Sequence, residues 1–316
     1  MQVVFGFKKF KIRDYPLPRV VAIGTFDGVH KAHRRIIKTA VQKAKISKGT
    51  SIVLTFSPHP AKVTRSSKLP DLITSIAHRL KLIGELGPDI CIIVDFDKKF
   101  ANIRASDFVR GILKQKLGAS FVVVGENFNF GKKKAGNAAY LKKRQRIFQI
   151  KPIVLPAYKK GVKTVSSSQI RNLISTGKIK QAEAMLGRTF SVIGIVEKGA
   201  RRGAVLGFAT ANIRAHQEVL PPGGVYAVRA KVGKKWYRAM LNIGYRPTFY
   251  KTNAQMAIEA HIFNFNRKIY GQTIEIQFIS RIRKEKMFSN TQDLRKQLLL
   301  DKHKIKRIFR RLSKNL

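Results

Sequence analysis

Two histidines, His30 and His33, lie three positions apart at the end of the stretch VVAIGTFDGVHKAH, residues 20–33. The stretch begins with a β-branched, apolar run, breaks at Gly24, and passes into a helical pattern near His33. A strand that turns at a glycine into a helix brings backbone N–H groups and two imidazoles together, which suits a phosphate chain. Nucleotidyl transfer needs mainly fixed donors of this kind, so we expect chemistry on a nucleotide.

Length and composition indicate a folded globular protein. The chain has 316 residues, of which 44% are hydrophobic, enough for two domains with separate cores. The single cysteine, Cys91, excludes a disulfide framework and a multi-cysteine zinc site, and its setting in ICIIV predicts a buried, inert thiol. No apolar run approaches membrane-spanning length, and we expect a soluble cytoplasmic protein without membrane association.

The charge of the chain is extreme. It has 64 Lys and Arg residues against 17 Asp and Glu, a formal net charge of +47. Such a surface attracts nucleic acid whatever its fold, through counterion release. The basic residues are spread along the whole chain and are not gathered on one helix. We therefore expect mostly solvated surface, with weak non-specific nucleic-acid association as a side effect.

The first part of the chain alternates strand-like and helix-like segments. The expected strands are short apolar runs rich in Val and Ile, as in parallel sheets covered on both faces: 20–24, 51–56, 90–96, 121–125 and 151–158. Helical spacing marks 33–46, 76–86, 106–117, 166–175 and 179–186. Repeated βα units predict a doubly wound, Rossmann-like α/β domain. Ligands of such sheets bind beyond the C-terminal ends of the strands, where His30, His59 and Asn127 fall.

The pattern changes after Gly187. Five β-rich segments follow, at 190–199, 224–233, 234–244, 257–265 and 272–283, joined by Gly, Pro or Asn turns. They predict an antiparallel barrel or sandwich, of which we favour the barrel. A final helix is expected over 291–312, with Thr291 as its N-cap. The predicted domains are 1–187 and 188–316.

The stretch around the two histidines resembles the signature G-x-F-D-G-x-H-x-G-H of the bacterial bifunctional riboflavin kinase/FAD synthetase family. In that family the signature forms the ATP site of the adenylyltransferase module. The resemblance assigns ATP binding to the matching residues Gly24, Phe26, Asp27, Gly28, His30 and His33. The sequence departs from the signature at Ala32, where the family has glycine.

Three further segments of the first domain resemble the same family in the same order. Residues 57–60, SPHP, resemble a loop whose histidine, here His59, faces the flavin, and 125–137 resemble a segment whose matches are Asn127, Phe128 and Phe130. SSSQIR, 166–171, resembles an element that holds the distal ATP phosphates through Ser168 and Arg171. Taken singly, these segments read as a turn, a basic glycine loop and an ordinary N-cap with an exposed arginine.

The second domain carries an independent set of motifs. GAVLGFATANI, 203–213, resembles the riboflavin kinase signature G-x(3)-G-[FY]-P-T-A-N-[IL], with Ala209 in place of the proline. The resemblance implies ATP binding by Gly203, Gly207, Thr210 and Asn212, and Mg²⁺ binding by the oxygen atoms of the last two. The flavin-facing matches in the segment LNIGYRPTF are Asn242, Arg246, Pro247 and Thr248.

Glu259 alternates with an apolar face formed by Met256, Ile258, Ala260 and Ile262, and shares the other face with His261. A glutamate in that position is usually only solvated. In the family the matching glutamate is the general base that takes the proton of the riboflavin 5′-hydroxyl. The catalytic residues implied by the resemblance are therefore Glu259, His30, His33 and Arg171.

The resemblance implies two reactions. ATP phosphorylates riboflavin to FMN in the second domain, and the first domain adenylylates FMN with a second ATP to FAD and pyrophosphate. Two alternatives stay open: a nucleotidyltransferase for another phosphate acceptor, and a basic nucleic-acid-binding protein on a degenerate enzyme scaffold. The motifs of the second domain argue against the first alternative. A flavin assay beside a salt titration of nucleic-acid binding separates the second.

Overall fold

The structure is a computed structural model that describes residues 1–8, 10–64, 71–161, 163–199, 207–216, 219–245 and 256–314. It divides into two compact units, one of residues 1–72 and 76–170 and the other of residues 73–75 and 171–316. The units therefore part at residue 170, whereas the sequence analysis set the domain boundary at 187. The helix at 179–186 and residues 171–175 of the helix before it lie between these positions and are grouped with the second unit.

The first unit is built on a parallel sheet of six strands in the order β1-β4-β3-β2-β5-β8. The strands are β1 (Gln2–Phe5), β2 (Arg19–Ile23), β3 (Thr50–Ser57), β4 (Ile90–Asp95), β5 (Ala119–Gly125) and β8 (Lys151–Leu155). From β2 the chain winds outward through β3 and β4, and then crosses to β5 and β8 on the other side. The predicted doubly wound fold is confirmed. Its topological switch point lies between β2 and β5, where such folds bind ligands.

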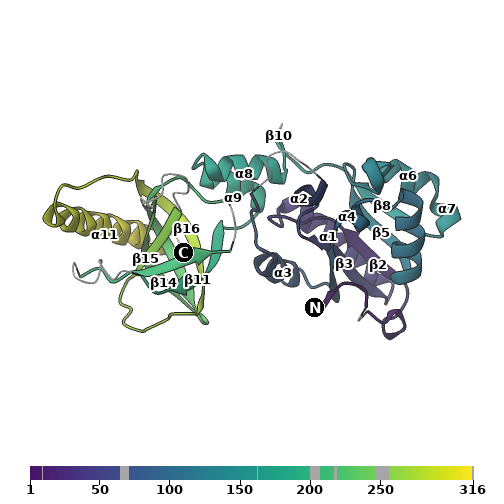
Figure 1. The fold of residues 1–316 in the computed structure, drawn as a ribbon, viewed down its shortest axis with the longest axis horizontal. Helices are drawn as coiled ribbons and strands as arrows, with labels where there is room; N and C mark the ends of the chain where they lie inside the picture. The colour runs from purple at the N-terminus through teal and green to yellow at the C-terminus, as the bar shows by residue number, and fades with distance from the viewer. Residues whose placement is uncertain are drawn as a thin grey trace. The chain divides into compact units, whose positions relative to one another are not determined.

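Helices cover both faces of this sheet, as Figure 1 shows. On one face α1 (Lys31–Ile46) and α3 (Ile76–Gly84) pack on Val20, Ala22, Val53 and Val123. The neighbouring residues Val21, Ile52 and Val122 point to the opposite face, onto the helical segment 105–116 and Leu141 of α6 (Ala138–Lys143). Alternate residues are thus buried on opposite faces, which is why the strand sequences are almost continuously apolar.

Shorter elements complete the first unit. They are α2 (Pro60–Thr64), α4 (Lys98–Ala101), α7 (Gln145–Phe148), the 3-10 turns Ile12–Asp14 and Lys132–Lys134, and the two-residue strands β6 (Asn129–Phe130), β7 (Gly136–Asn137), β9 (Lys159–Lys160) and β10 (Lys163–Thr164).

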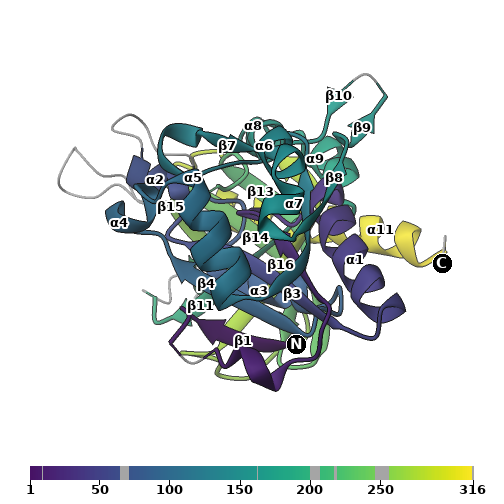
Figure 2. The same cartoon turned by 90° about the vertical axis from the view of Figure 1, so that its right-hand side faces the viewer.

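Two elements of the first unit differ from the sequence prediction. The helix expected over 106–117 is a short α5 (Ala105–Asp107) that continues as a π-helical segment, Phe108–Lys116. Strand β1 was not predicted, because its four residues QVVF bury only Val4 and carry no clear alternation. It is added in parallel beside β4 at the edge of the sheet, next to the N-terminus (Figure 2).

The second unit contains a closed antiparallel barrel in the strand order β11-β12-β15-β14-β13-β16. The strands are β11 (Ser191–Glu197), β12 (Ala211–Ala215), β13 (Gly224–Val232), β14 (Lys235–Tyr245), β15 (Met256–Ile262) and β16 (Thr273–Arg283). Ile258, Ala260 and Ile262 are buried and pair with Ile243, Leu241 and Ala239, as the alternation predicted. The predicted barrel is confirmed, with β12 added from the segment read only as a motif.

Among the described residues from 163 onward, the structure shows the helices α8 (Ser167–Ser175), α9 (Ile179–Leu186) and α11 (Thr291–Lys314). Helix α11 packs on the outside of the barrel, where Ile305 and Phe309 contact Val225, Met240 and Ile282 (Figure 1). The buried Asp301 of α11 accepts a hydrogen bond from Arg283 of β16 at 2.9 Å. Within the described residues, no helix is long and apolar enough to span a membrane.

Cys91 lies in the middle of β4, fully buried against α1 and α3. Burial raises the pKa of its thiol to about 12, an effect that nearby Arg79 opposes. A thiol with that pKa is protonated at neutral pH, and only the thiolate reacts readily. The structure agrees with the predicted inert cysteine.

We therefore expect a thiol reagent such as 5,5′-dithiobis(2-nitrobenzoate) to leave Cys91 unmodified in native buffer near pH 7.5. Labelling should appear only as the protein unfolds, with a guanidinium midpoint equal to that of the circular dichroism signal. Protein in excess guanidinium, labelled within the mixing time, is the positive control. Fast labelling at zero denaturant would contradict the buried position of the thiol.

Candidate functional site

The first unit holds a cavity of about 1020 Å³ beyond the C-terminal ends of its strands. Residues following β2, β3, β4, β5 and β8 all contribute to its lining. The volume lies at the upper end of the range usual for small-molecule sites, about 300–1,000 Å³. The cavity is therefore large enough for a ligand the size of a nucleotide with its acceptor.

The turn from β2 into α1 forms one wall and has an unusual backbone. Phe26, Gly28 and Val29 have φ values of 49°, 80° and 38°, in the left-handed region that β-branched residues avoid. A side chain at Gly24 would meet the Phe26 ring at 2.9 Å, so the bend needs a glycine there. At the non-glycine residues Phe26 and Val29, a left-handed backbone costs on the order of 1–3 kcal/mol each, and such residues cluster at functional sites.

Neighbouring segments hold this turn in place. The hydroxyl of Thr55 on β3 donates to the carbonyl of Thr25 at 3.1 Å, and Ser167 donates to the carbonyl of Asp27 at 2.9 Å. Asp27 is fully buried and lies within electrostatic range of Arg79 on α3, which itself donates to the carbonyl of Phe56 at 3.1 Å. Burial lowers the pKa of Arg79, and the charge of Asp27 acts against that shift. The two charges stabilise each other beneath the turn.

The two histidines lie at the start of α1. His30 is the N-cap residue, and its Nδ1 accepts a hydrogen bond from the His33 N–H at 3.4 Å. The two rings are stacked with centroids 3.6 Å apart, and the Phe26 ring meets the His33 ring edge-on at 5.4 Å. No acidic residue lies in the first turn of α1. The positive N-terminal end of α1 therefore faces the cavity, and no carboxylate in the first turn of the helix neutralises it.

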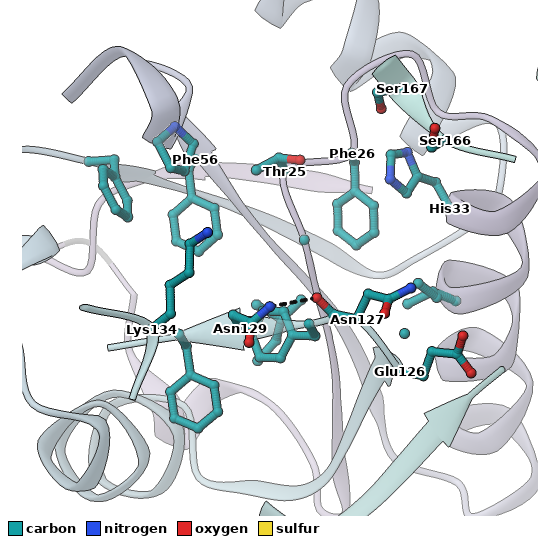
Figure 3. Close-up of a pocket in the computed structure, with 18 of the residues that line it drawn as sticks. Thr25, Phe26, His33, Phe56, Glu126, Asn127, Asn129, Lys134, Ser166 and Ser167 are labelled. Atoms are coloured by element: carbon teal, nitrogen blue, oxygen red, sulfur yellow. Dashed lines mark hydrogen bonds between the residues drawn. The ribbon is translucent and has the colours of Figure 1, made fainter. Parts of the chain in front are cut away.

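Figure 3 shows His33, Ser166 and Ser167 toward one end of the cavity, and Phe56 with Lys134 at the other. The second end is aromatic, because Phe96, Phe100, Phe108, Phe128 and Phe130 also line the cavity. Phe128 and Phe130 stack at a centroid distance of 5.5 Å. One end is thus suited to phosphates and the other to a flat aromatic ring.

The charge of the lining is strongly positive. Among the described residues it contains five Lys or Arg side chains, Arg35, Lys98, Lys132, Lys133 and Lys134, and one carboxylate, Glu126. The excess of basic residues in the chain is therefore also present in the cavity lining. An excess of four positive charges favours a polyanionic ligand.

The predicted residues of the first domain do not all reach this cavity. Its lining includes Gly24, Phe26, His30, His33, Asn127, Phe128 and Phe130. Asp27 and Gly28 lie in the turn behind it, and Ser168 lies on the exposed side of α8. His59 lies between β3 and α2, where its Nδ1 accepts a hydrogen bond from the Ala61 N–H at 3.1 Å. Arg171 is grouped with the second unit.

In the second unit, the strand register aligns the predicted residues of the kinase site. Glu259 on β15 pairs with Asn212 on β12 on one side and with Asn242 on β14 on the other. Directly paired residues point to the same side of a sheet, with Cβ atoms about 4.5–5.5 Å apart. The carboxylate and the two amides therefore form a row on the outer face of the barrel.

The loop before β12 contains Gly207 and Thr210. Thr210 lies two residues before Asn212 in the chain. A side chain at Gly199 would collide with the Asn212 amide, so the chain after β11 passes close to this residue. Gly203, Arg246, Pro247 and Thr248, which were predicted to bind ATP or flavin, lie outside the described residues.

Sequence reasoning missed several residues that line the cavity, above all Thr25, Phe56, Phe96, Phe100 and Ser167. A usable signal exists for two of them. Phe56 and Phe96 end the apolar runs of β3 and β4, at the sheet edge where ligands bind. Thr25 comes from a loop, whereas Phe100 belongs to the short α4 and Ser167 begins α8. The local sequence does not indicate that these three positions meet at one cavity.

Two family sequence models match the chain. FAD synthetase matches residues 13–169, and riboflavin kinase matches residues 186–309. Apart from residues 73–75, the first range lies within the unit that contains the cavity, and the second covers the barrel and most of α11.

Curated relatives carry both parts. Proteins described as bifunctional riboflavin kinase/FMN adenylyltransferase are 35% identical in Bacillus subtilis, over 96% of each chain, and 30% identical in Escherichia coli K12, over 92% of each. A crystal structure titled as a macrolide-efflux protein from Streptococcus pneumoniae is 28% identical, covering 96% of this chain and 98% of the other, with a TM-score of 0.83. The resemblance read from the motifs is confirmed.

Proposed function

The chain belongs to the bifunctional riboflavin kinase/FMN adenylyltransferase family, and we propose how its residues divide the two reactions. The protein phosphorylates riboflavin with ATP to give FMN, and then adenylylates FMN with ATP to give FAD and pyrophosphate. Residues 188–316 perform the first reaction and residues 1–187 the second. The observation that carries this assignment is the row of Asn212, Glu259 and Asn242 in the barrel, separate from the cationic cavity of the other unit.

In the kinase site Glu259 is the general base. Its carboxylate accepts the proton of the riboflavin 5′-hydroxyl as the hydroxyl oxygen attacks the γ-phosphate of ATP. Gly203 and Gly207 let the loop backbone approach the phosphates, while Asn242, Arg246, Pro247 and Thr248 contact the flavin. Phosphoryl transfer depends mainly on positioning and charge neutralisation, so one carboxylate beside two amides is sufficient side-chain chemistry.

The same residues fit Mg²⁺. The hydroxyl of Thr210 and the amide oxygen of Asn212 are hard oxygen donors, and the register places the Glu259 carboxylate beside Asn212. Mg²⁺ keeps several waters and binds substrate phosphates, so a small protein donor set is enough. Thr210 and Asn212 would hold the ion, which supplies charge neutralisation at the ATP phosphates.

In the adenylyltransferase site the FMN phosphate attacks the α-phosphate of ATP. Gly24, Phe26, Asp27 and Gly28 shape the nucleotide pocket, and His30 and His33 donate to the triphosphate as pyrophosphate leaves. Ser168 and Arg171, on α8, act on the distal phosphates. The flavin binds toward His59, Asn127, Phe128 and Phe130, and the aromatic end of the cavity supports this orientation.

Weak association with nucleic acid and a location in the cytoplasm stay predictions. Contrary to the even spread of charge along the chain, the exposed side of α11 concentrates basic residues: Arg295, Lys296, Lys306, Arg307, Arg310 and Arg311. Any such association depends on salt and does not require the flavin sites.

We expect Glu259→Gln to lower the rate of FMN formation from riboflavin about 100-fold or more, because a positioned general base contributes about 10²–10⁴. Conversion of supplied FMN to FAD should not change. The flavins are resolved by chromatography after incubation with ATP and Mg²⁺. Asp293→Asn, which removes an exposed carboxylate of the same unit, is the matched control.

The double change His30→Ala with His33→Ala should have the reverse effect. FMN formation continues, whereas FAD formation falls about 100-fold or more, since each donor lost at a developing charge costs about 10²–10³. The two experiments control each other. If either set of changes abolishes both steps in a folded protein, the proposed division of the reactions is wrong.

Ala32 gives a graded test, because its methyl group lies in the cavity lining beside His33. We expect the KM for ATP in FAD formation to rise in the order Gly, Ala, Val at this position, with about tenfold between Ala32 and Ala32→Val. The KM for ATP in riboflavin phosphorylation should be equal in all three proteins. Equal KM values in FAD formation would show that Ala32 does not contact the nucleotide.

A further inference from the structure

His261 makes one hydrogen bond that links two distant parts of the barrel unit. Its Nδ1 lies 2.9 Å from the carbonyl oxygen of Ala209, 52 residues earlier in the chain. A carbonyl oxygen can only accept, so Nδ1 carries the proton and donates. Ala209 immediately precedes Thr210, and β12 begins one residue later. The bond therefore fixes the backbone at the point where the predicted phosphate loop enters the sheet.

The imidazole is itself held between aromatic rings. The centroid of its ring lies 5.1 Å from that of Phe208 and 5.6 Å from that of Phe263. Phe208 is 4% exposed and packs with Ile305 and Phe309 of α11. The ring therefore has little freedom to change rotamer, and the packing of Phe208 anchors the loop directly before Ala209.

Helix α11 closes this cluster. The Lys302 ammonium lies over the Phe208 ring at 5.5 Å and over the Phe263 ring at 5.9 Å. Burial lowers the pKa of His261, and the Lys302 charge acts in the same direction, while the hydrogen bond to Ala209 opposes both. The imidazole is therefore neutral near pH 7, with its proton at the position that Ala209 requires.

The position of His261 on β15 connects the bond to the reaction. His261 lies two residues after Glu259, so both side chains project from the same face of the strand, about 7 Å apart along it. Glu259 pairs with Asn212, and Ala260 pairs with Ala211. One strand thus carries the proposed base and also the residue that holds the loop bearing Thr210.

The hydrogen bond from His261 constrains the loop more with alanine at position 209 than it would with the proline of the family signature. Proline has a fixed φ, whereas alanine leaves the backbone free to rotate. At Ala209 the loop lacks the constraint of a ring, and the bond from His261 supplies a constraint from outside the loop. Because the bond uses the backbone carbonyl, it does not depend on the side chain at this position.

We propose that His261 is a positioning residue of the kinase site, which holds Thr210 and Asn212 in place to bind the ATP phosphates opposite Glu259. The inference rests on the proposed function of the barrel unit. Its alternative is a histidine that contributes only packing to the cluster of Phe208, Phe263 and Lys302. The two differ in what they require of the side chain, a donor in one case and a ring in the other.

Two substitutions separate the donor from the ring. His261→Phe keeps an aromatic ring between Phe208 and Phe263 but has no donor for Ala209. His261→Asn loses the ring but keeps an N–H near the position of Nδ1. The matched control is His303→Phe, an exposed histidine on α11 next to Lys302.

The readout is the steady-state kinetics of riboflavin phosphorylation at varied ATP·Mg, with FAD formation from FMN measured in the same preparations. We expect His261→Phe to raise the KM for ATP·Mg about tenfold with a smaller change in kcat. His261→Asn should stay within about threefold of the unaltered protein, and His303→Phe should not differ from it. A purely structural role predicts a lower active fraction, which reduces kcat at constant KM.

An unchanged KM in His261→Phe overturns the inference, and so does a KM for His261→Asn as high as that for His261→Phe. Variants that fold poorly are recognised by thermal denaturation, and their KM still reports on the folded fraction. Failure of the proposed function is a separate result. In that case the unaltered protein would not phosphorylate riboflavin at all.

Discussion

The first unit depends on a strained turn between β2 and α1 that has to be held from outside. Phe26 and Val29 adopt backbone angles that their side chains disfavour. Hydrogen bonds from Thr55 and Ser167, together with the buried charges of Asp27 and Arg79, compensate for that cost. Once the turn is held, the start of α1 faces the switch point of the sheet. His30 and His33 then lie at the phosphate end of the cavity.

The barrel unit meets a different constraint, which is strand register. Glu259 faces outward because Ile258 and Ala260, on either side of it, are buried in the barrel. A slip of one residue would exchange the two faces and bury the carboxylate. Closure of the barrel leaves no free edge along which β15 could slide. The same strand pairing that places the barrel core therefore sets the alignment of Asn212, Glu259 and Asn242.

The charged residues of the two candidate sites favour the same class of substrate. With 17 acidic residues among 316, a carboxylate in a functional position is uncommon, and Glu259 and Asp27 are both retained within their motifs. The cavity has an excess of positive side chains, whereas the row on the barrel combines amides with one carboxylate. Both arrangements are suited to phosphate compounds. The cavity attracts phosphates with cationic side chains. The barrel instead places a carboxylate base beside amide oxygens that suit a hard metal ion.

The sequence alone determined the family, the doubly wound fold, the barrel, and most elements to within a few residues, because burial on both faces and alternation leave direct marks in composition. It also identified the short motifs, since their residue types lie next to one another in the chain. The edge strand β1 and the π-helical segment 108–116 left no such mark. Loop residues from five strand ends meet in one cavity only after the sheet has formed, and only strand pairing puts Asn212 and Asn242 on either side of Glu259. The contact of His261 with Ala209 is of the same kind, because 52 residues separate the two partners and only barrel closure joins them.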